Sequence, residues 1–230
     1  MIQMFCISYA GGNAGFFEPL IKKFHDQIDC TAIEYTARGS RKKELPYSSF
    51  DEMTEDISDK INQRLDSCND IIIFGYSMGS LVAYEILANE MLIKKPKLLI
   101  VAAHYAPTRS SVEETLSNLS DEDLVKQMLK FSPMNRQVFS DKRFWPLILP
   151  QIRNDYRLLE SYDFDKTKKK LDVDLKVLYS KNDIPFQLIS EWKEMSLKDT
   201  HFYEFEGDHF FLKNNEERIA DIILKYIQTI

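Results

Sequence analysis

The feature that most restricts the fold of this 230-residue chain is a continuously apolar run that leads into a serine between two glycines. Residues 70–75, Asp-Ile-Ile-Ile-Phe-Gly, show no polar alternation, which is typical of a strand covered on both faces. The motif Gly-Tyr-Ser-Met-Gly occupies residues 75–79, and Ser80–Asn89 has a helical pattern. A strand, a sharp turn and a helix in this order predict that Ser77 stands where a buried strand turns into a helix.

Strand-like and helix-like segments alternate through most of the chain. This alternation favours an α/β fold with a mostly parallel central sheet flanked by helices. The runs expected to form strands are Met1–Ser8, Cys30–Tyr35, Asp70–Gly75, Lys97–Ala103, Leu175–Ser180 and His201–Phe205. The segments expected to form the flanking helices are Ala14–Phe24, Phe50–Leu65, Ser80–Asn89 and Glu216–Ile227.

The alternation stops after Pro107, and no convincing buried strand follows until about Asp165. Ser120–Phe131 and Lys142–Leu159 instead have helical patterns. We therefore predict that residues 1–106 and 166–230 form the α/β core. Residues 107–165 are expected to form a helical lid inserted into that core.

Composition and charge exclude several classes of protein. A formal net charge of −6 disfavours binding to nucleic acid. The three cysteines, Cys6, Cys30 and Cys68, are odd in number and include no Cys-x-x-Cys pair, so we expect neither a disulfide framework nor a metal site. No signal peptide and no apolar run long enough to cross a membrane are recognised, and we expect a cytoplasmic protein.

Ser77 is the candidate nucleophile. A serine hydroxyl is a weak nucleophile, so it must be presented to a general base, and a turn between strand and helix achieves this. The position also places the serine at a helix N-terminus, where free N–H groups favour a developing anion. The alternative is a turn serine that has no chemical role.

His209 and Asp183 are the candidate base and orienting acid. His209 follows the last predicted strand in a Gly-Asp-His-Phe-Phe turn, whereas His201 falls within that strand. Asp183 comes just after the preceding predicted strand, so both side chains are expected at the carboxyl edge of the sheet. An acid there can bind the second ring nitrogen of the histidine and fix its tautomer. A turn histidine and a surface aspartate without a role are the alternatives.

An oxyanion hole requires two backbone donors. The N–H of Met78 is the first candidate, because it directly follows the nucleophile. The second is expected from the loop after the first strand, Ser-Tyr-Ala-Gly-Gly at residues 8–12. We favour the N–H of Ala10 and keep that of Gly11 as the alternative. A plain glycine turn at the end of the strand is the competing interpretation.

Together these motifs resemble those of type II thioesterases, stand-alone editing enzymes of nonribosomal peptide and polyketide synthesis that belong to the α/β-hydrolase superfamily. The resemblance spans the chain and rests on residues 5–12, on Thr-Ala-Arg-Gly-Ser at 36–40, on residues 75–80 and on residues 207–211. Three residues depart from the usual pattern: Tyr76 replaces a histidine, Ser8 a proline and Asp208 a glycine.

The resemblance implies an α/β-hydrolase fold and hydrolysis of acyl thioesters on the phosphopantetheine arm of acyl or peptidyl carrier proteins. It implies no cofactor beyond the phosphopantetheine of the substrate, and a monomer. The residues themselves indicate only acyl transfer by a serine triad. A carboxylesterase or lipase, an acyltransferase and a non-enzymatic binding module therefore remain alternatives.

Substrate contacts are expected from five residues in or near these motifs: Tyr9, Gly11, Tyr76, His104 and Phe210. For His104, which follows the fourth predicted strand, a satisfied structural histidine is the alternative.

Two further groups of residues are candidates for substrate contacts. The lid is expected to shape an apolar acyl chamber, or else only its own core, with Met128, Phe131, Phe144 and Trp145. A basic cluster near the catalytic edge, Arg38, Arg41, Lys42 and Lys43, is expected to meet a pantetheine phosphate or an acidic carrier helix, or else only solvent.

Overall fold

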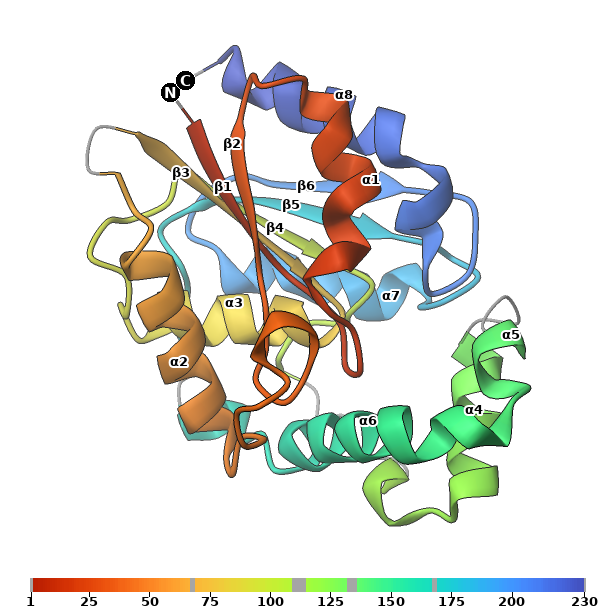
Figure 1. Ribbon diagram of the computed structural model, residues 1–230. Coiled ribbons are helices and arrows are strands. Elements are labelled where there is room, and N and C mark those ends of the chain that lie inside the picture. Colours follow the sequence, from red (N-terminus) through yellow and green to blue (C-terminus); the bar gives the residue numbers. More distant parts are fainter. Residues whose placement is uncertain (1, 67–68, 109–114, 132–135, 167–168, 230) are drawn as a thin grey trace.

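The fold is built on one parallel sheet with the strand order β2-β1-β3-β4-β5-β6 (Figure 1). The computed structural model describes residues 2–66, 69–108, 115–131, 136–166 and 169–229. All five strand pairings of this sheet are parallel, which confirms the predicted fold class. The strands are β1 (Ile2–Ile7), β2 (Asp29–Ile33), β3 (Asp70–Tyr76), β4 (Leu98–Ala102), β5 (Asp174–Tyr179) and β6 (Thr200–Glu204).

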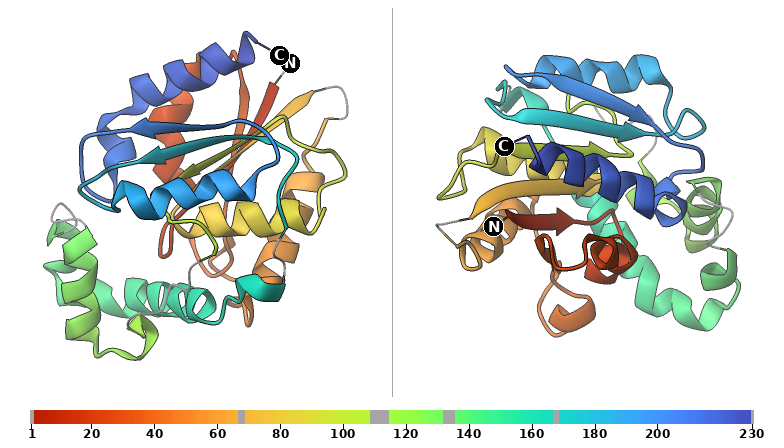
Figure 2. Two further views of the ribbon diagram at one scale, coloured as in Figure 1. Left: turned by 180° about the vertical axis from the view of Figure 1, so that it is seen from behind. Right: turned by 90° about the horizontal axis from the view of Figure 1, so that it is seen from above.

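Two layers of helices cover the sheet (Figure 2). Helices α2 and α3 pack on one face, against side chains such as Phe5 and Ile7 of β1. Helices α1 and α8 pack on the other face, against Met4 and Cys6 of the same strand. Side chains of a strand alternate between faces, so a strand in the middle of the sheet is apolar throughout. The helices are α1 (Glu18–Ile21), α2 (Phe50–Asn62), α3 (Met78–Ala88), α4 (Asp121–Phe131), α5 (Arg136–Phe139), α6 (Trp145–Glu160), α7 (Phe186–Ile189) and α8 (Glu216–Ile227).

Two parts of the core differ from the prediction. The helix expected over Ala14–Phe24 is divided into a 3-10 turn, the short α1 and a second 3-10 turn. Pro19 lies in the first turn of α1 and has no N–H to continue a helix from the preceding turn. The second difference is an unpredicted pair of short helices, α7 and a 3-10 helix over Ser190–Met195, which buries Trp192.

The segment between β4 and β5 contains helices α4, α5 and α6, and Figure 1 shows α4 and α5 beside one end of α6, away from the sheet. These helices share a small hydrophobic cluster of their own, formed by Leu124, Val125, Met128, Phe139, Leu149 and Ile152. Residues 109–114 and 132–135 of the predicted lid lie outside the described residues. The helical character of the rest agrees with the prediction, whereas its role as a lid stays a prediction.

Gly75 and Gly79 allow three elements to meet at very short range. A Cβ at Gly79 would collide with the backbone carbonyl of Ile7 in β1, and one at Gly75 would collide with the backbone of Gly79. Helix α3 therefore begins almost in contact with β1 and β3. Glycines two positions before and after Ser77 make this close packing possible.

We expect Gly79→Ala to lower the free energy of unfolding by about 3 kcal/mol, because the added methyl group meets backbone atoms that cannot move aside. Gly15→Ala is the control, because a Cβ there would meet only the side-chain oxygen of Asn13, at 3.1 Å. Urea denaturation of both variants tests the prediction, and equal small losses would contradict it.

Candidate active site

Ser77 occupies the turn between β3 and α3 with φ 52° and ψ −119°. A positive φ is unfavourable for a residue that has a Cβ, so the surrounding packing must hold this turn in place. Its N–H donates to the carbonyl of Ala102 at 2.7 Å, which ties the turn to β4. The serine thus stands at the N-terminus of α3, as predicted.

The three predicted triad side chains meet at the carboxyl edge of the sheet. The Ser77 hydroxyl donates to Nε2 of His209 at 3.1 Å, and Nδ1 of His209 lies 2.9 Å from Oδ2 and 3.0 Å from Oδ1 of Asp183. The tautomer that fits both contacts carries its proton on Nδ1, which leaves Nε2 free to accept the serine proton. The side chains of His209 and Asp183 are only 13% and 8% exposed, so this chain of hydrogen bonds is largely shielded from solvent.

The loop that carries His209 is fixed through its backbone. The carbonyl of His209 accepts from the Tyr76 hydroxyl at 2.7 Å, and the carbonyl of Gly207 accepts from the Ser180 hydroxyl at 2.6 Å. The carboxylate of Asp208 accepts from the N–H of Phe210 at 2.8 Å, so Asp208 stabilises the turn and is not the partner of the imidazole.

Tyr76 is fully buried, which corrects its predicted role as a substrate contact. It precedes Ser77 on the strand, so its side chain points to the opposite face of the sheet. There it packs against the rings of Phe16 and Phe211. Its hydroxyl bonds to the carbonyl of His209. The alternation of side chains along the strand is the sequence signal that could have indicated this orientation, because Tyr76 directly precedes Ser77.

A pocket of about 190 Å³ lies beside Ser77 and His209. Three of the predicted substrate contacts line it: Tyr9, Gly11 and Phe210. A larger hollow of about 460 Å³ lies at the far end of α3, between Ile86 and Val173, and contains none of the triad. Of these two cavities, the one beside the triad can hold a substrate carbonyl next to Ser77.

The helical segment supplies the apolar wall of this cavity. Of the four residues predicted to form an acyl chamber, Met128 and Phe131 line the cavity. Phe144 is 52% exposed, and Trp145 packs in the cluster between the helices and donates to the carbonyl of Phe139. Further lining residues that sequence reasoning missed are Val138, Phe139, Ile148, Ile152, Tyr156 and Lys213. Ile148, Ile152 and Tyr156 recur every four residues, a spacing that indicates one helical face.

The backbone donors near Ser77 separate the two oxyanion alternatives. The N–H of Gly11 donates to Oδ2 of Asp155 at 2.7 Å and is therefore occupied. Over the ranges that the structure describes, the N–H groups of Ala10 and Met78 have no acceptor. Ala10 also lines the cavity beside Ser77. The geometry thus favours Ala10 over Gly11 as the second donor.

His104 does not line this cavity in the described part of the chain, which corrects its predicted substrate contact. It is buried, its Nδ1 lies 2.8 Å from the carbonyl of Tyr105, and its own carbonyl accepts from the indole of Trp192. Burial, the largest cause, lowers the pKa of His104 from 6.5 to about 4. The alternative of a satisfied structural histidine fits these contacts.

Two of the four residues of the predicted basic cluster form ion pairs within the protein. Arg38 is buried and forms a bidentate pair with Asp155, and Arg41 pairs with Glu44 and Asp56. The expectation that Arg38 meets a phosphate is therefore wrong, because its guanidinium does not reach solvent. Lys42 and Lys43 remain exposed.

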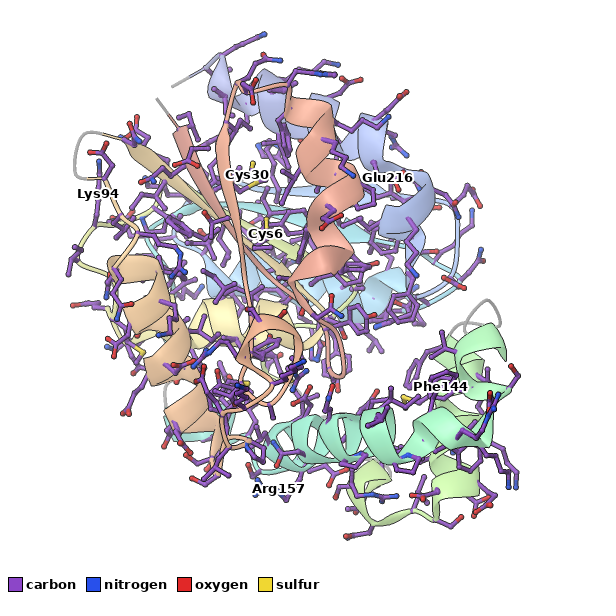
Figure 3. All side chains as sticks on the ribbon, viewed as in Figure 1. Cys6, Cys30, Lys94, Phe144, Arg157 and Glu216 are labelled. Atoms are coloured by element: carbon purple, nitrogen blue, oxygen red, sulfur yellow. The ribbon has the colours of Figure 1, made fainter. Side chains whose placement is uncertain are left out.

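The described residues contain no group of three His, Cys, Asp or Glu side chains able to hold a metal ion. Within the same ranges Cys6 and Cys30, both labelled in Figure 3, are free thiols, and Cys68 lies outside the described residues. No helix in the described ranges is both long and apolar enough to cross a membrane.

Comparison with known proteins places this geometry in context. A family model described as "Thioesterase domain" matches residues 2–227. The gramicidin S biosynthesis protein GrsT of Aneurinibacillus migulanus is 24% identical over 234 residues, which cover 100% of this chain and 90% of GrsT.

Solved structures of other proteins are similar to this chain along nearly its whole length. The type II thioesterase BorB from the borrelidin biosynthetic cluster is 29% identical with a TM-score of 0.87, and the alignment covers 97% of this chain and 91% of BorB. ClbQ from the colibactin NRPS/PKS pathway has a TM-score of 0.91 at 24% identity, covers 99% of this chain and 97% of its own, and so shares the fold.

We expect Tyr76→Phe to slow the labelling of Ser77 by a fluorophosphonate about tenfold, because His209 loses the hydrogen bond that holds its carbonyl. Tyr84→Phe is the matched control, because the Tyr84 hydroxyl donates to the carbonyl of Lys169 at the same 2.7 Å, away from the triad. Both variants should lose about 1 kcal/mol of stability. Equal labelling rates in the two variants would argue against a positioning role for Tyr76.

Acid should destabilise the protein through His104. As the pH falls from 6.5 to 4, the unfolded chain takes up a proton on His104 and the folded chain does not, so unfolding becomes more favourable. The contribution of neutral His104 to the free energy of unfolding is fully present above pH 6.5. It is lost as the pH falls, and the loss reaches about 3 kcal/mol below pH 4.

Urea denaturation of the wild type and His104→Gln at several pH values between 4 and 8 measures this effect. The difference in free energy of unfolding between the two proteins should be constant from pH 7 to 8 and should change below pH 6.5. A constant difference down to pH 4 would rule the effect out.

Proposed function

This chain belongs to the thioesterase domain family, and we propose from that premise that it hydrolyses acyl groups held as thioesters on the phosphopantetheine arms of carrier proteins. The observation that carries the proposal is the hydrogen-bonded series Ser77–His209–Asp183 beside an apolar cavity. The names of GrsT and BorB connect relatives of this chain with the biosynthesis of gramicidin S and borrelidin. The proposed role is accordingly that of an editing, type II thioesterase of a nonribosomal peptide or polyketide synthase.

In the proposed acylation step, the Ser77 oxygen attacks the thioester carbonyl while Nε2 of His209 takes the hydroxyl proton. The negative charge that forms on the carbonyl oxygen is stabilised by the N–H groups of Met78 and Ala10. Asp183 keeps the histidine in the tautomer that can accept this proton and stabilises the imidazolium. When the tetrahedral intermediate collapses, the carbon–sulfur bond breaks and the thiol leaves with the proton from His209.

In the proposed deacylation step, His209 takes a proton from water, and the resulting hydroxide attacks the acyl-serine. The ester bond breaks, His209 returns the proton to the Ser77 oxygen, and the free acid leaves. Both steps use only side chains and backbone amides of one chain. We therefore propose a monomer that needs no cofactor beyond the phosphopantetheine of its substrate, acting in the cytoplasm together with the synthase.

The walls of the cavity suit an apolar acyl group. Met128, Ile148, Ile152 and Tyr156 contribute apolar surface within reach of Ser77. Burial of an acyl chain there contributes roughly 0.8 kcal/mol of binding free energy per methylene group. In this proposal the helical segment selects the acyl group, and the triad at the carboxyl edge of the sheet cleaves the thioester bond.

We expect Ser77→Ala to slow the release of acyl groups from acylated carrier proteins by a factor of about 10³ or more, because the oxygen that would form the acyl-enzyme is removed. Intact-mass measurement of the carrier before and after incubation measures this release. Ser190→Ala serves as a control, since the hydroxyl of Ser190 donates to the carbonyl of Gln187 in α7 and lies outside the triad. Loss of the acyl mass with Ser77→Ala at the wild-type rate would refute the triad.

The same assay separates the alternative activities. A carboxylesterase would hydrolyse an aryl ester and leave the acyl carrier intact. An acyltransferase would form product only when an alcohol or amine acceptor is added. Either result would replace the proposed reaction while keeping Ser77 as the nucleophile.

A further inference from the structure

We infer that Asp155 of α6 is a positioning residue for the loop that supplies the second oxyanion donor, and that Arg38 holds Asp155 in place for this task. The loop comprises residues 8–12 and is here called the oxyanion loop. The inference rests on the proposed function, because it assigns a partner to the proposed donor Ala10. It connects the helical segment directly to the chemistry at Ser77.

Both carboxylate oxygens of Asp155 accept hydrogen bonds from within the protein. Its side chain is 0% exposed. Oδ2 accepts from the N–H of Gly11 at 2.7 Å and from Arg38 at 2.7 Å, and Oδ1 accepts a second bond from Arg38 at 2.7 Å. The same guanidinium donates to the carbonyl of Gly12 at 3.0 Å. The pair therefore holds a donor and an acceptor of the oxyanion loop at once.

Other contacts fix the two ends of the loop. The carbonyl of Ser8 accepts from the Tyr35 hydroxyl at 2.8 Å, and the N–H of Gly12 donates to the carbonyl of Tyr9 at 2.8 Å. Ala10 lies between these anchored positions, and its N–H has no acceptor in the described residues. Asp155 takes the neighbouring donor of Gly11, so the Ala10 donor is the one left for a substrate oxygen.

Helix α6 lies directly on this loop. A Cβ at Gly11, which has φ +79°, would be 2.5 Å from Cγ1 of Ile152, one turn before Asp155. Ile152 and Tyr156 line the cavity beside Ser77. One stretch of α6 thus shapes the acyl cavity and orients the oxyanion loop, so displacement of α6 would disturb both.

Burial alone does not account for this arrangement. A buried ion pair is often no more stabilising than apolar residues of similar size, although removal of one partner is costly. A pair that only tethers α6 should therefore be replaceable by apolar side chains without loss of activity. A pair that positions Gly11 should not be, because an apolar side chain cannot accept its N–H.

Two double variants separate these roles. Arg38→Met/Asp155→Asn removes both charges but keeps an oxygen that can accept from Gly11, whereas Arg38→Met/Asp155→Leu removes the charges and the acceptor. Tyr162→Phe/Glu85→Leu is the control, because the hydrogen bond from Tyr162 to the buried Glu85, at 2.7 Å, ties the chain after α6 to α3 without touching the oxyanion loop. The readouts are kcat and KM for an acyl-pantetheine thioester, the Kd of an acyl trifluoromethyl ketone, and Tm.

We expect the leucine variant to keep KM within about threefold of the wild type, to lose about 30-fold in kcat, and to bind the trifluoromethyl ketone more weakly by the same factor. The asparagine variant should recover most of both losses, and the control should alter only Tm. Equal kcat values in the two double variants, or a kcat loss that follows Tm across all three, would overturn the inference. If the leucine variant does not fold, Arg38→Met/Asp155→Ala replaces it, because alanine also lacks an acceptor.

The wild-type protein separates this inference from the proposed function. If it cleaves the thioester and the two double variants behave alike, only the inference fails. If it cleaves no thioester, the proposed function fails, and the inference is then judged by the rate at which a fluorophosphonate labels Ser77 in the same variants. That rate should show the same order, with the asparagine variant faster than the leucine variant.

Discussion

The near-contact between the start of α3 and the strands β1 and β3 governs the rest of the structure. Gly79 lies against the carbonyl of Ile7, so no side chain fits between them. This packing holds Ser77 at φ 52°, a conformation that an isolated turn would leave. The carboxyl edge of the sheet then becomes a rigid support from which the hydroxyl of Ser77 reaches His209.

The position of His209 depends on residues that bond to its loop and its ring without contacting the substrate. Tyr76 and Ser180 hold the carbonyls of His209 and Gly207, while Asp183 orients the ring. Two neighbours in the sequence therefore have different roles. Ser77 faces the cavity, whereas Tyr76 points to the other face of the sheet and bonds to the carbonyl of His209. These contacts restrict the imidazole to the orientation in which Nε2 can accept the serine proton. Such preorganisation lowers the entropic cost of reaching the transition state.

The helical segment contributes to the site in two ways. Its helix α6 contributes apolar residues to the cavity wall and a buried carboxylate to the oxyanion loop. In the proposed mechanism, recognition of the acyl group and stabilisation of the oxyanion thus share one structural element. An acyl chain that shifted α6 would alter the stabilisation of the transition state as well as its own binding.

The amino-acid sequence alone predicts the parallel α/β fold, the turn at Ser77 and the three side chains that meet there. It could do so because apolar runs, glycines and positions after strands are local signals whose consequences follow from the topology of a parallel sheet. Three-dimensional packing was needed to show that Arg38 pairs with Asp155, that the Tyr76 hydroxyl bonds to the carbonyl of His209, that His104 is internal, and that Gly11 donates its N–H to Asp155. Arg38 and Asp155 are 117 residues apart, and a contact over that separation is set by how α6 docks on the core, which no local pattern records.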